Sequence, residues 1–428
     1  MSMRSTRLSR RGFLKTSAAV TGAFAAPCIV PSRAFGANER IVLGHIGVGG
    51  QGTGNLNGFA GQKDVSVAAI CDVDATRVAK AMKAAQGKGH MPVAFEDYRR
   101  LLERDDIDAV VVSTPDHWHA LNTIDACAAG KDVFCEKPLT LTILEGRKMV
   151  NAAREHGRVV QTGSMQRSSK EFRTACELVR NGRIGKVHTV LVGINTPNHP
   201  GAPVPDSEPP AELDYEMWLG PAPERPYNKN RVHYNFRFFR DYSGGQMTNW
   251  GAHHLDITQW GLGMDDSGPV KVEGAGTFHP QNWHEVTETC RVTHTYADGT
   301  KVLVGQGHKD IPNGTTFIGS EGKIHVNRGK LVVEPEEIAK QPLPDDAVRL
   351  YESNDHKRDF LDCIRSRRKP ICDVEVGHRS ATVCHLGNIA IDLGRPLTWN
   401  PETEEFADDD EANERRLTTY RSPWALKS

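Results

Sequence analysis

Neither sign of charge predominates in this sequence. Its 428 residues include 53 Lys and Arg and 54 Asp and Glu, which gives a net charge of −1. Proteins that bind nucleic acid or acidic polymers usually carry a basic bias, so we expect no such partner. Paired cysteine motifs are also missing, because none of the nine cysteines belongs to a C-x-x-C pair. We therefore expect reduced cysteines and no disulfide framework, with Cys71 and Cys135 as small core residues.

Long apolar runs are absent too. The longest candidate, Ala18 to Val30, is too short and too rich in Gly and Pro for a stable membrane anchor. It follows Ser9-Arg-Arg-Gly-Phe-Leu-Lys15, and small residues from Ala34 to Ala37 supply a cleavage site. This arrangement resembles a twin-arginine export signal. It predicts a signal peptide at 1–37, the export machinery as a partner and a periplasmic or otherwise exported protein. The alternative is a basic leader on a cytoplasmic protein.

The fold is organised around a glycine-rich turn. An apolar run from Ile41 leads into Gly47-x-Gly49-x-x-Gly52, and a helix-compatible stretch follows. Gly47 permits a tight turn, Gly49 lets the backbone approach phosphate, and Gly52 lets the helix pack on the strand. The helix N-terminus then faces the anion. The pattern predicts a site for the pyrophosphate of a dinucleotide, and the alternative is an ordinary glycine-rich turn.

A carboxylate stands where the ribose of such a cofactor is bound. Val65 to Cys71 has the pattern of the next strand, and Asp72 follows it, 20 residues after Gly52. An acid at about this spacing accepts the ribose 2′-hydroxyl and repels a 2′-phosphate. We therefore expect NAD as the cofactor, and Arg77 keeps NADP open as the alternative.

Strand-like and helix-like segments alternate after this turn. The predicted strands are 65–71, 108–113, 132–135 and 158–161, with helical patterns at 75–85, 120–129 and 141–156 between them. The β-branched run at 108–113 is typical of a parallel strand buried on both faces. The order predicts an α/β fold with an N-terminal doubly wound parallel sheet. Ligands bind beyond the carboxyl ends of such strands, which is where Asp72, Thr114, His119 and Lys137 fall.

Together these motifs resemble one enzyme family. The glycine turn, Asp72, Ser113-Thr-Pro115 with His119, and Glu136-Lys-Pro138 are similar to the glucose–fructose oxidoreductase, inositol dehydrogenase and MocA-like family. The resemblance extends from about residue 40 to the C-terminus. It implies hydride transfer to or from a sugar, glycoside or polyol, and a cis bond before Pro138.

The family resemblance also implies a domain organisation and a cofactor site. An NAD(P)-binding Rossmann domain would span 38–163. A substrate and oligomerisation domain, 164–428, would carry an open, mostly antiparallel sheet and C-terminal helices that return to the first domain. The predicted cofactor-binding residues are Gly47, Gly49, Gly50, Gln51, Gly52, Asp72, Thr114, Pro115, His119, Glu136, Lys137 and Gln166.

Lys137 is the first candidate for the chemistry. It stands between a strand end and a proline, so its backbone is held rigidly. Its charge would stabilise a developing alkoxide, and partial burial would bring its pKa towards neutrality. The alternative is a surface lysine in a turn.

A second chemical centre lies between Gly244 and Trp260. Asn249, His253 and Asp256 are spaced by four and three residues, so a helix places them on one face. The family pattern at this point is D-x-x-x-H-x-x-D, which implies catalytic roles for Asn249, His253 and Asp256 together with Lys137. Asn249 stands where an aspartate is usual, and an amide takes no proton. The base is therefore His253 or Lys137.

The predicted substrate contacts come from three segments of the second domain. They are Arg167, Tyr234, Arg237, Trp250 and His253. The alternatives are a hinge at Gln166–Arg167, and a packed cover loop or subunit contact for the long segment from Asn195 to Arg240.

Two histidine groups also permit a metal hypothesis. His253-His254 with Asp256 is one, and His117-x-His119 is the other. Adjacent helical residues point about 100° apart, so His253 and His254 do not readily share an ion. We expect no metal.

The second sheet has a clear strand pattern. Strands are predicted at 270–278, 285–296, 301–305, 315–319 and 323–326, with hairpin turns at 297–300 and 320–322. An open sheet with an uncovered face favours a homo-oligomer.

Export narrows the functional hypothesis. Free NAD is not supplied outside the cytoplasm, so we expect a tightly bound cofactor that is recycled within each turnover. Two reactions fit: paired oxidation and reduction of two sugars, and glycoside cleavage by transient oxidation, elimination and reduction. The alternative from another class is a non-catalytic sugar-binding protein that retains NAD.

Overall fold

The computed structural model describes residues 40–197, 199 and 201–426, and the predicted signal peptide lies outside this range. The described part begins with a six-stranded parallel sheet of order β3-β2-β1-β4-β5-β6. Its strands are β1 (Ile41–Ile46), β2 (Val65–Cys71), β3 (Val93–Phe95), β4 (Ala109–Val112), β5 (Asp132–Cys135) and β6 (Val160–Thr162). Each helix that connects them packs on the sheet: α1 (Gly50–Phe59), α2 (Ala75–Gln86), α3 (Tyr98–Leu102), α4 (Asp116–Ala128) and α5 (Ile143–Glu155).

The sheet carries apolar side chains on both faces. Val110, Val112 and Val133 belong to one buried cluster, and Val111 and Phe134 belong to another. A strand buried on both sides needs this near-continuous apolar run. The predicted α/β fold with a doubly wound parallel sheet is confirmed.

The second sheet has nine strands among the described residues, in the order β13-β12-β11-β7-β10-β9-β8-β14-β15. Only the β7–β10 pair is parallel, so the prediction of a mostly antiparallel sheet is also confirmed. Its strands are β7 (Val187–Ile194), β8 (Lys271–Phe278), β9 (Thr287–Thr295), β10 (Lys301–Gln306), β11 (Gly314–Gly319), β12 (Lys323–Asn327), β13 (Lys330–Glu334), β14 (Leu397–Asn400) and β15 (Glu405–Phe406). The sequence pattern missed the last three strands.

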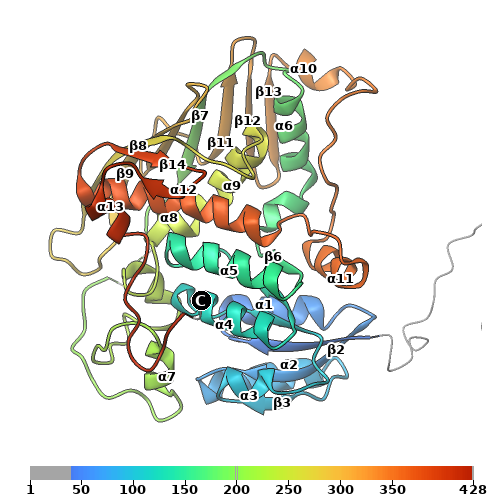
Figure 1. The fold of residues 1–428 in the computed structure, drawn as a ribbon, viewed down its shortest axis with the longest axis vertical. Helices are drawn as coiled ribbons and strands as arrows, with labels where there is room; N and C mark the ends of the chain where they lie inside the picture. Colours follow the sequence, from blue (N-terminus) through green and yellow to red (C-terminus); the bar gives the residue numbers. More distant parts are fainter. Residues whose placement is uncertain (1–39, 198, 200, 427–428) are drawn as a thin grey trace, which may run out of the picture. The chain divides into compact units, whose positions relative to one another are not determined.

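Helices cover one face of this sheet and join it to the first (Figure 1). These elements are η3 (Met165–Ser168), α6 (Lys170–Arg180), α8 (Gly245–Asn249), α9 (Gly251–Leu262), α10 (Glu337–Lys340), α11 (His356–Ser366), α12 (Val374–Leu393) and α13 (Asp410–Glu414). Phe360 of α11 packs edge-on against Phe59 of α1 and Phe134 of β5. α12 lies beside α5 and also packs on β8 and β9. The C-terminal helices thus return to the first sheet and hold the two sheets together.

The segment from 195 to 243 covers the carboxyl ends of β2 and β4. It contains α7 (Tyr215–Leu219) and η4 (His233–Phe238) and has its own small core of aromatic and aliphatic side chains. The Trp218 carbonyl accepts hydrogen bonds from Trp118 and His117 at the start of α4. The backbone of Asp214 also donates to the Val73 carbonyl. This segment therefore forms a wall of the space where a ligand of the parallel sheet would lie.

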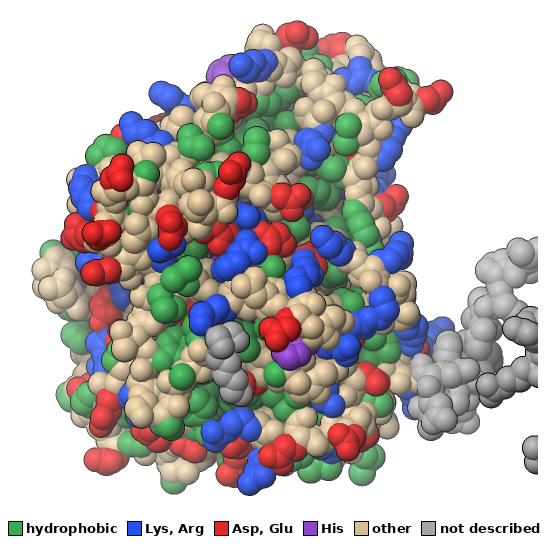
Figure 2. All heavy atoms as spheres, viewed as in Figure 1, with side chains coloured by type: hydrophobic (Ala, Val, Ile, Leu, Met, Phe, Trp, Pro, Cys, Tyr) green, Lys and Arg blue, Asp and Glu red, His purple; other side chains and the backbone are tan. Residues whose placement is uncertain are grey.

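The surface of the described part agrees with the balanced composition. On the face in Figure 2, acidic and basic side chains are interspersed. Among residues 40–426, no helix combines the length and apolar character needed to cross a bilayer. The eight cysteines of the described residues are buried and unpaired, as expected.

Candidate active site

The glycine turn is closed by close backbone contacts. Gly47 follows β1 with a φ of +80°, and a Cβ there would lie 2.8 Å from the Ser113 backbone. A Cβ on Gly52 would lie 2.1 Å from the Gly47 carbonyl oxygen. Only glycine fits both positions. α1 then begins at Gly50, so its unpaired N–H groups lie at the turn and can bind an anion.

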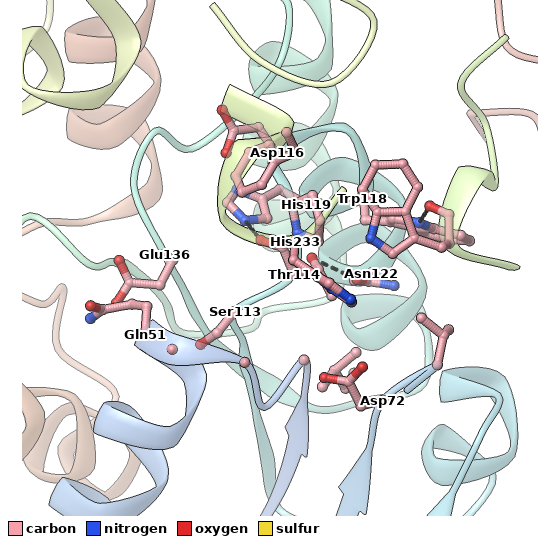
Figure 3. Close-up of a pocket in the computed structure, with 18 of the residues that line it drawn as sticks. Gln51, Asp72, Ser113, Thr114, Asp116, Trp118, His119, Asn122, Glu136 and His233 are labelled. Atoms are coloured by element: carbon pink, nitrogen blue, oxygen red, sulfur yellow. Dashed lines mark hydrogen bonds between the residues drawn. The ribbon is translucent and has the colours of Figure 1, made fainter. Parts of the chain in front are cut away.

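A cavity of about 500 Å³ begins at this turn (Figure 3). It is lined by predicted residues from both parts of the chain: Gly47, Gly49, Gly50, Gln51, Asp72, Thr114, Pro115, His119, Glu136, Lys137, Tyr234, Arg237 and Asn249. Gln51 and Glu136 lie at the start of α1, Asp72 at the end of β2, and His119 on α4. The carboxyl ends of β1, β2, β4 and β5 thus converge on one cavity, as doubly wound sheets require.

Asp72 is positioned by the backbone of the glycine turn. Its Oδ2 accepts a hydrogen bond from the Val48 N–H at 2.7 Å, and its Oδ1 accepts one from the Asp74 N–H at 3.1 Å. Burial raises the pKa of this carboxyl, whereas the Val48 bond and the Arg77 charge lower it. Each oxygen keeps a lone pair for a ribose hydroxyl. Arg77 also lines this end of the cavity.

His119 is held between two carbonyl groups. Its Nδ1 lies 2.8 Å from the Pro138 oxygen and its Nε2 lies 2.9 Å from the Thr114 oxygen. Both ring nitrogens must donate, so the ring is a cation. Burial alone would lower its pKa, but Cys135, Asp116 and the Pro138 carbonyl outweigh burial and raise the pKa of His119 to about 10. The ring fixes the loop after β4 against the cis Lys137–Pro138 bond.

Glu136 joins β5 to α1. Its Oε1 accepts hydrogen bonds from Gln51 Nε2 at 2.9 Å and from Asn55 Nδ2 at 2.8 Å. The carboxylate is 6% exposed. A negative charge at the start of a helix is stabilised by the helix dipole. Glu136 therefore sets the position of the phosphate-binding turn relative to Lys137.

Lys137 and Asn249 meet at the end of the cavity formed by the second part of the chain. Lys137 Nζ donates to Asn249 Oδ1 at 2.8 Å, and Asn249 Nδ2 donates to Gln246 Oε1 at 2.8 Å. The second bond fixes the amide so that its oxygen faces the lysine. Burial lowers the pKa of Lys137 to about 8, although the Glu136 charge acts against this. The amine is therefore poised to exchange a proton near neutral pH.

His253 does not line the cavity. It lies on α9 and is 7% exposed, and burial and the Lys137 charge hold its pKa well below the ordinary value. A neutral imidazole with a strongly depressed pKa is a weak base. Of the two bases predicted from the sequence, the geometry favours Lys137.

Arg167 was predicted to contact the substrate, and Asp256 was predicted to belong to the catalytic group. In the structure the two side chains form an ion pair with each other. The guanidinium lies 2.9 Å from Asp256 and 2.7 Å from Asp265, and both Arg167 and Asp256 are fully buried. Asp256 also accepts from Ser380 of α12 at 2.8 Å. Neither group lines the cavity, because a buried guanidinium requires carboxylate partners and the two are held by each other.

Two further predicted residues lie away from the cavity. Gln166 is 2% exposed within η3 and does not line the cavity. Trp250 packs against His254, with the Arg328 guanidinium 4.8 Å from the centre of its ring. The structure therefore does not bring Gln166 and Trp250 together with the other predicted site residues.

Tyr234 and Arg237 do line the cavity. Both belong to η4, and the Arg237 guanidinium lies 3.8 Å from the centre of the Tyr234 ring. Tyr234 is 57% exposed, so its ring is available for stacking on a sugar face. The long segment is therefore both a cover and a wall of the site.

Asp116 was missed by the sequence analysis. It begins α4, lines the cavity, and its Oδ2 accepts a hydrogen bond from Ser243 at 2.6 Å. Burial raises its pKa, whereas His119, Ser243 and Lys137 act in the opposite direction. Its place right after Pro115, at the carboxyl end of a predicted strand, was the available signal. Other missed cavity residues are Trp118, Asn122, Met217, Trp218, His233, Phe236 and Ser243.

The histidine groups considered for a metal do not converge. His119 uses both ring nitrogens for carbonyl groups. Among the described residues, neither His117-x-His119 nor His253-His254 with Asp256 brings three ligand atoms together.

Comparison with known families agrees with this geometry. Residues 41–164 match a family described as oxidoreductase family, NAD-binding Rossmann fold, and residues 201–426 match its C-terminal alpha/beta domain. The chain belongs to the Gfo/Idh/MocA oxidoreductase family. The family resemblance drawn from the glycine turn and Glu136-Lys-Pro138 is thus confirmed.

Individual relatives are more distant. An uncharacterised oxidoreductase, YrbE of Bacillus subtilis, is 25% identical over 64% of this chain and 69% of that protein. A glycosyl hydrolase family 109 protein of Saccharopolyspora erythraea is 33% identical, but the match covers only 43% of this chain and 45% of that protein. The structure of scyllo-inositol dehydrogenase from Lactobacillus casei, with NAD(H) and scyllo-inositol, aligns with a TM-score of 0.59 at 20% identity. That alignment covers 84% of this chain and 99% of the dehydrogenase, and it shows a shared fold.

Proposed function

We propose that this protein is an NAD-dependent oxidoreductase that acts on a hydroxyl group of a sugar, glycoside or polyol. The observation that carries the proposal is the single cavity that joins Asp72 and the glycine turn to Lys137 and Asn249. The residues fit the cofactor, because the turn admits no Cβ at Gly52 and Asp72 keeps free lone pairs. When bound, the nicotinamide would supply a hydride acceptor at the Lys137 end.

Lys137 is the residue that moves the proton. Its amine, with a pKa of about 8, takes the proton of the substrate hydroxyl when neutral and stabilises the alkoxide when charged. Asn249 orients the amine through the 2.8 Å bond to Nζ. Tyr234 and Arg237 supply a stacking surface and hydrogen-bond donors for the sugar.

NAD is the proposed form of the cofactor. The Asp72 carboxylate would repel a 2′-phosphate, whereas Arg77 at the same end of the cavity would attract one. Asp72 is bonded to the turn itself, so its position is better defined than that of Arg77. Measured affinities of the protein for NAD and NADP test this choice of cofactor. Tighter binding of NADP would contradict it.

Glycoside cleavage is the second candidate reaction. Relatives named as glycosyl hydrolase family 109 proteins and an alpha-N-acetylgalactosaminidase of Shewanella oneidensis favour it. A chromogenic glycoside tests it: release of the aglycone without build-up of reduced cofactor, and solvent deuterium beside the oxidised carbon, indicate oxidation, elimination and reduction. Net accumulation of reduced cofactor with no release indicates simple dehydrogenation.

Export and a retained cofactor form one further part of the proposal. The twin-arginine pattern at 9–15 supports transport of the folded protein with its cofactor to the periplasm. Nicotinamide that stays with the protein through dialysis is the expected result. Complete loss of the cofactor on gel filtration contradicts a retained cofactor.

Homo-oligomerisation through the open sheet also stays a prediction, to be tested by light scattering.

A substrate screen separates catalysis from simple binding. Cofactor-loaded protein is mixed with mono- and disaccharides while the absorbance of reduced nicotinamide is followed. If the protein is an enzyme, the absorbance of reduced nicotinamide changes with at least one sugar. It does not change in a Lys137→Met variant. Sugar binding without any change in either protein supports the non-catalytic alternative.

A further inference from the structure

A second cluster of chemically active side chains lies where β8 is connected to β9. His284 lies just before β9, Glu288 is the second residue of β9, and His199 comes from the chain after β7. His284 Nε2 lies 2.9 Å from Glu288 Oε1, and His199 Nε2 lies 3.4 Å from the same oxygen. One ligand atom from each residue falls within 4.8 Å of the others.

The central histidine of this cluster is buried without hydrogen bonds. His284 is 2% exposed, and neither of its ring nitrogens has a partner of acceptable geometry in the described structure. Glu288 Oε1 is buried and lacks one as well, despite its short distance to His284. An unsatisfied buried polar group costs about 1–3 kcal/mol. Three polar atoms that approach each other without hydrogen-bond geometry are what ligands of one ion would show.

A third imidazole, that of His279, stands beside the cluster. The ring centre of His279 lies 5.5 Å from that of His284 and 5.8 Å from that of His199. The Nδ1 atoms of His279 and His199 accept backbone N–H groups at 3.2 and 3.4 Å, and Nε2 of His199 is the nitrogen that lies near Glu288.

The ligand set and its spacing select a class of ion. Two atoms each about 2.1 Å from a tetrahedral zinc ion lie about 3.4 Å apart, close to the distances found here. Two histidines and one glutamate with an open position form a common catalytic zinc set, and imidazole favours first-row transition metals over Mg²⁺ or Ca²⁺.

We infer that His199, His284 and Glu288 bind a divalent transition metal ion such as Zn²⁺, with the fourth position open. These residues are separate from the metal candidates that the sequence suggested. They were missed because His199 lies 85 residues before His284, and His284 with Glu288 alone, four residues apart, supplies only two ligands.

The chain that leads to His199 is hydrogen-bonded to the helix that carries Asn249. The carbonyl of Thr196, three residues before His199, accepts from Gln246 Nε2 at 2.9 Å. Gln246 bonds to Asn249, which bonds to Lys137.

Metal binding is tested on the full-length protein without any turnover assay. After chelator treatment and dialysis, titration with Zn²⁺ is followed by calorimetry, and elemental analysis gives the metal content. We expect one Zn²⁺ per chain, no comparable uptake of Mg²⁺, and more than 100-fold weaker binding in both His284→Gln and Glu288→Gln. The exposed His188 of β7 provides the matched control, and His188→Gln binds as the wild type does.

Two controls make the outcome decisive. Glu288 is partly exposed, so Glu288→Gln is expected to fold even if His284→Gln does not. NAD content is measured on the same samples: loss of metal with retained NAD supports the site independently of the proposed function. Wild type that binds no more Zn²⁺ than Glu288→Gln overturns the inference and leaves a plain histidine–glutamate contact.

Discussion

Replacing Lys137 by Met is the change for which the structure gives the most detailed expectation. Burial lowers the pKa of Lys137 from 10.5 to about 8. At pH 7 about one tenth of such amines are neutral, which is roughly 300-fold more than for an unperturbed lysine. Loss of a positioned acid–base group costs about 10²–10⁴ in rate. We expect kcat/KM of Lys137→Met to fall by that factor, with little change in NAD binding.

The pH profile distinguishes a base from a fixed charge. With Lys137 as the base, the wild-type rate rises with pH and levels off above about pH 8. Lys137→Arg keeps the charge but cannot lose its proton, so it is expected to be as slow as Lys137→Met. Near-normal activity in Lys137→Arg would show that the charge alone acts. An unchanged rate and profile in Lys137→Met would refute the role altogether.

Lys137→Met is expected to raise the stability of the protein, although it lowers the activity. Below about pH 8 the folded protein keeps a buried charge that water would solvate better, which costs up to about 3 kcal/mol. Between about pH 8 and 10.5 the folded chain has lost this proton and the unfolded chain has not, so the penalty disappears as the pH rises. Lys137→Met is therefore expected to be more stable than wild type in urea at pH 7, by a margin that narrows towards pH 10.5.

Three further changes test the rest of the site. Asp72→Asn is expected to weaken NAD binding by about 10–100-fold and to narrow the preference over NADP, because a hydrogen bond to a charged group contributes about 1.5–3 kcal/mol; unchanged affinity by calorimetry would contradict the ribose assignment. Gly52→Ala is expected to abolish NAD binding, because its Cβ meets the Gly47 oxygen at 2.1 Å, whereas Gly54→Ala, with no atom within 4 Å, is expected to stabilise α1 by about 0.5–1 kcal/mol; equal effects of the two in melting and binding assays would argue against the turn. Asp256→Asn is expected to destabilise the protein by about 3–5 kcal/mol in denaturant, because Arg167 loses its buried partner; a loss of turnover with intact stability would instead restore Asp256 to the reaction.

The first sheet and its cofactor turn were predictable from the sequence because their signals are local. A glycine at Gly47 and Gly52 is demanded by backbone contacts within one strand–turn–helix unit. Asp72 follows the next strand, and the parallel topology brings it to the same edge. Lys137 was predictable for the same reason, since it closely follows β5.

The second part of the site was harder to predict because it depends on packing between distant segments. α9 is buried on nearly all sides, so the spacing of Asn249, His253 and Asp256 could not show which of them face the cavity. The helix is also interrupted after Asn249, where α8 ends. Asp256 faces Arg167 instead, a partner 89 residues away.

The most direct test of the central claim is the spectrum of cofactor-loaded protein mixed with sugars and glycosides. The account predicts that at least one of them reduces the bound nicotinamide, transiently or lastingly, and that Lys137→Met abolishes the change. NAD bound in the cavity with no reduction, and no glycoside cleavage, by any sugar of the panel would contradict it.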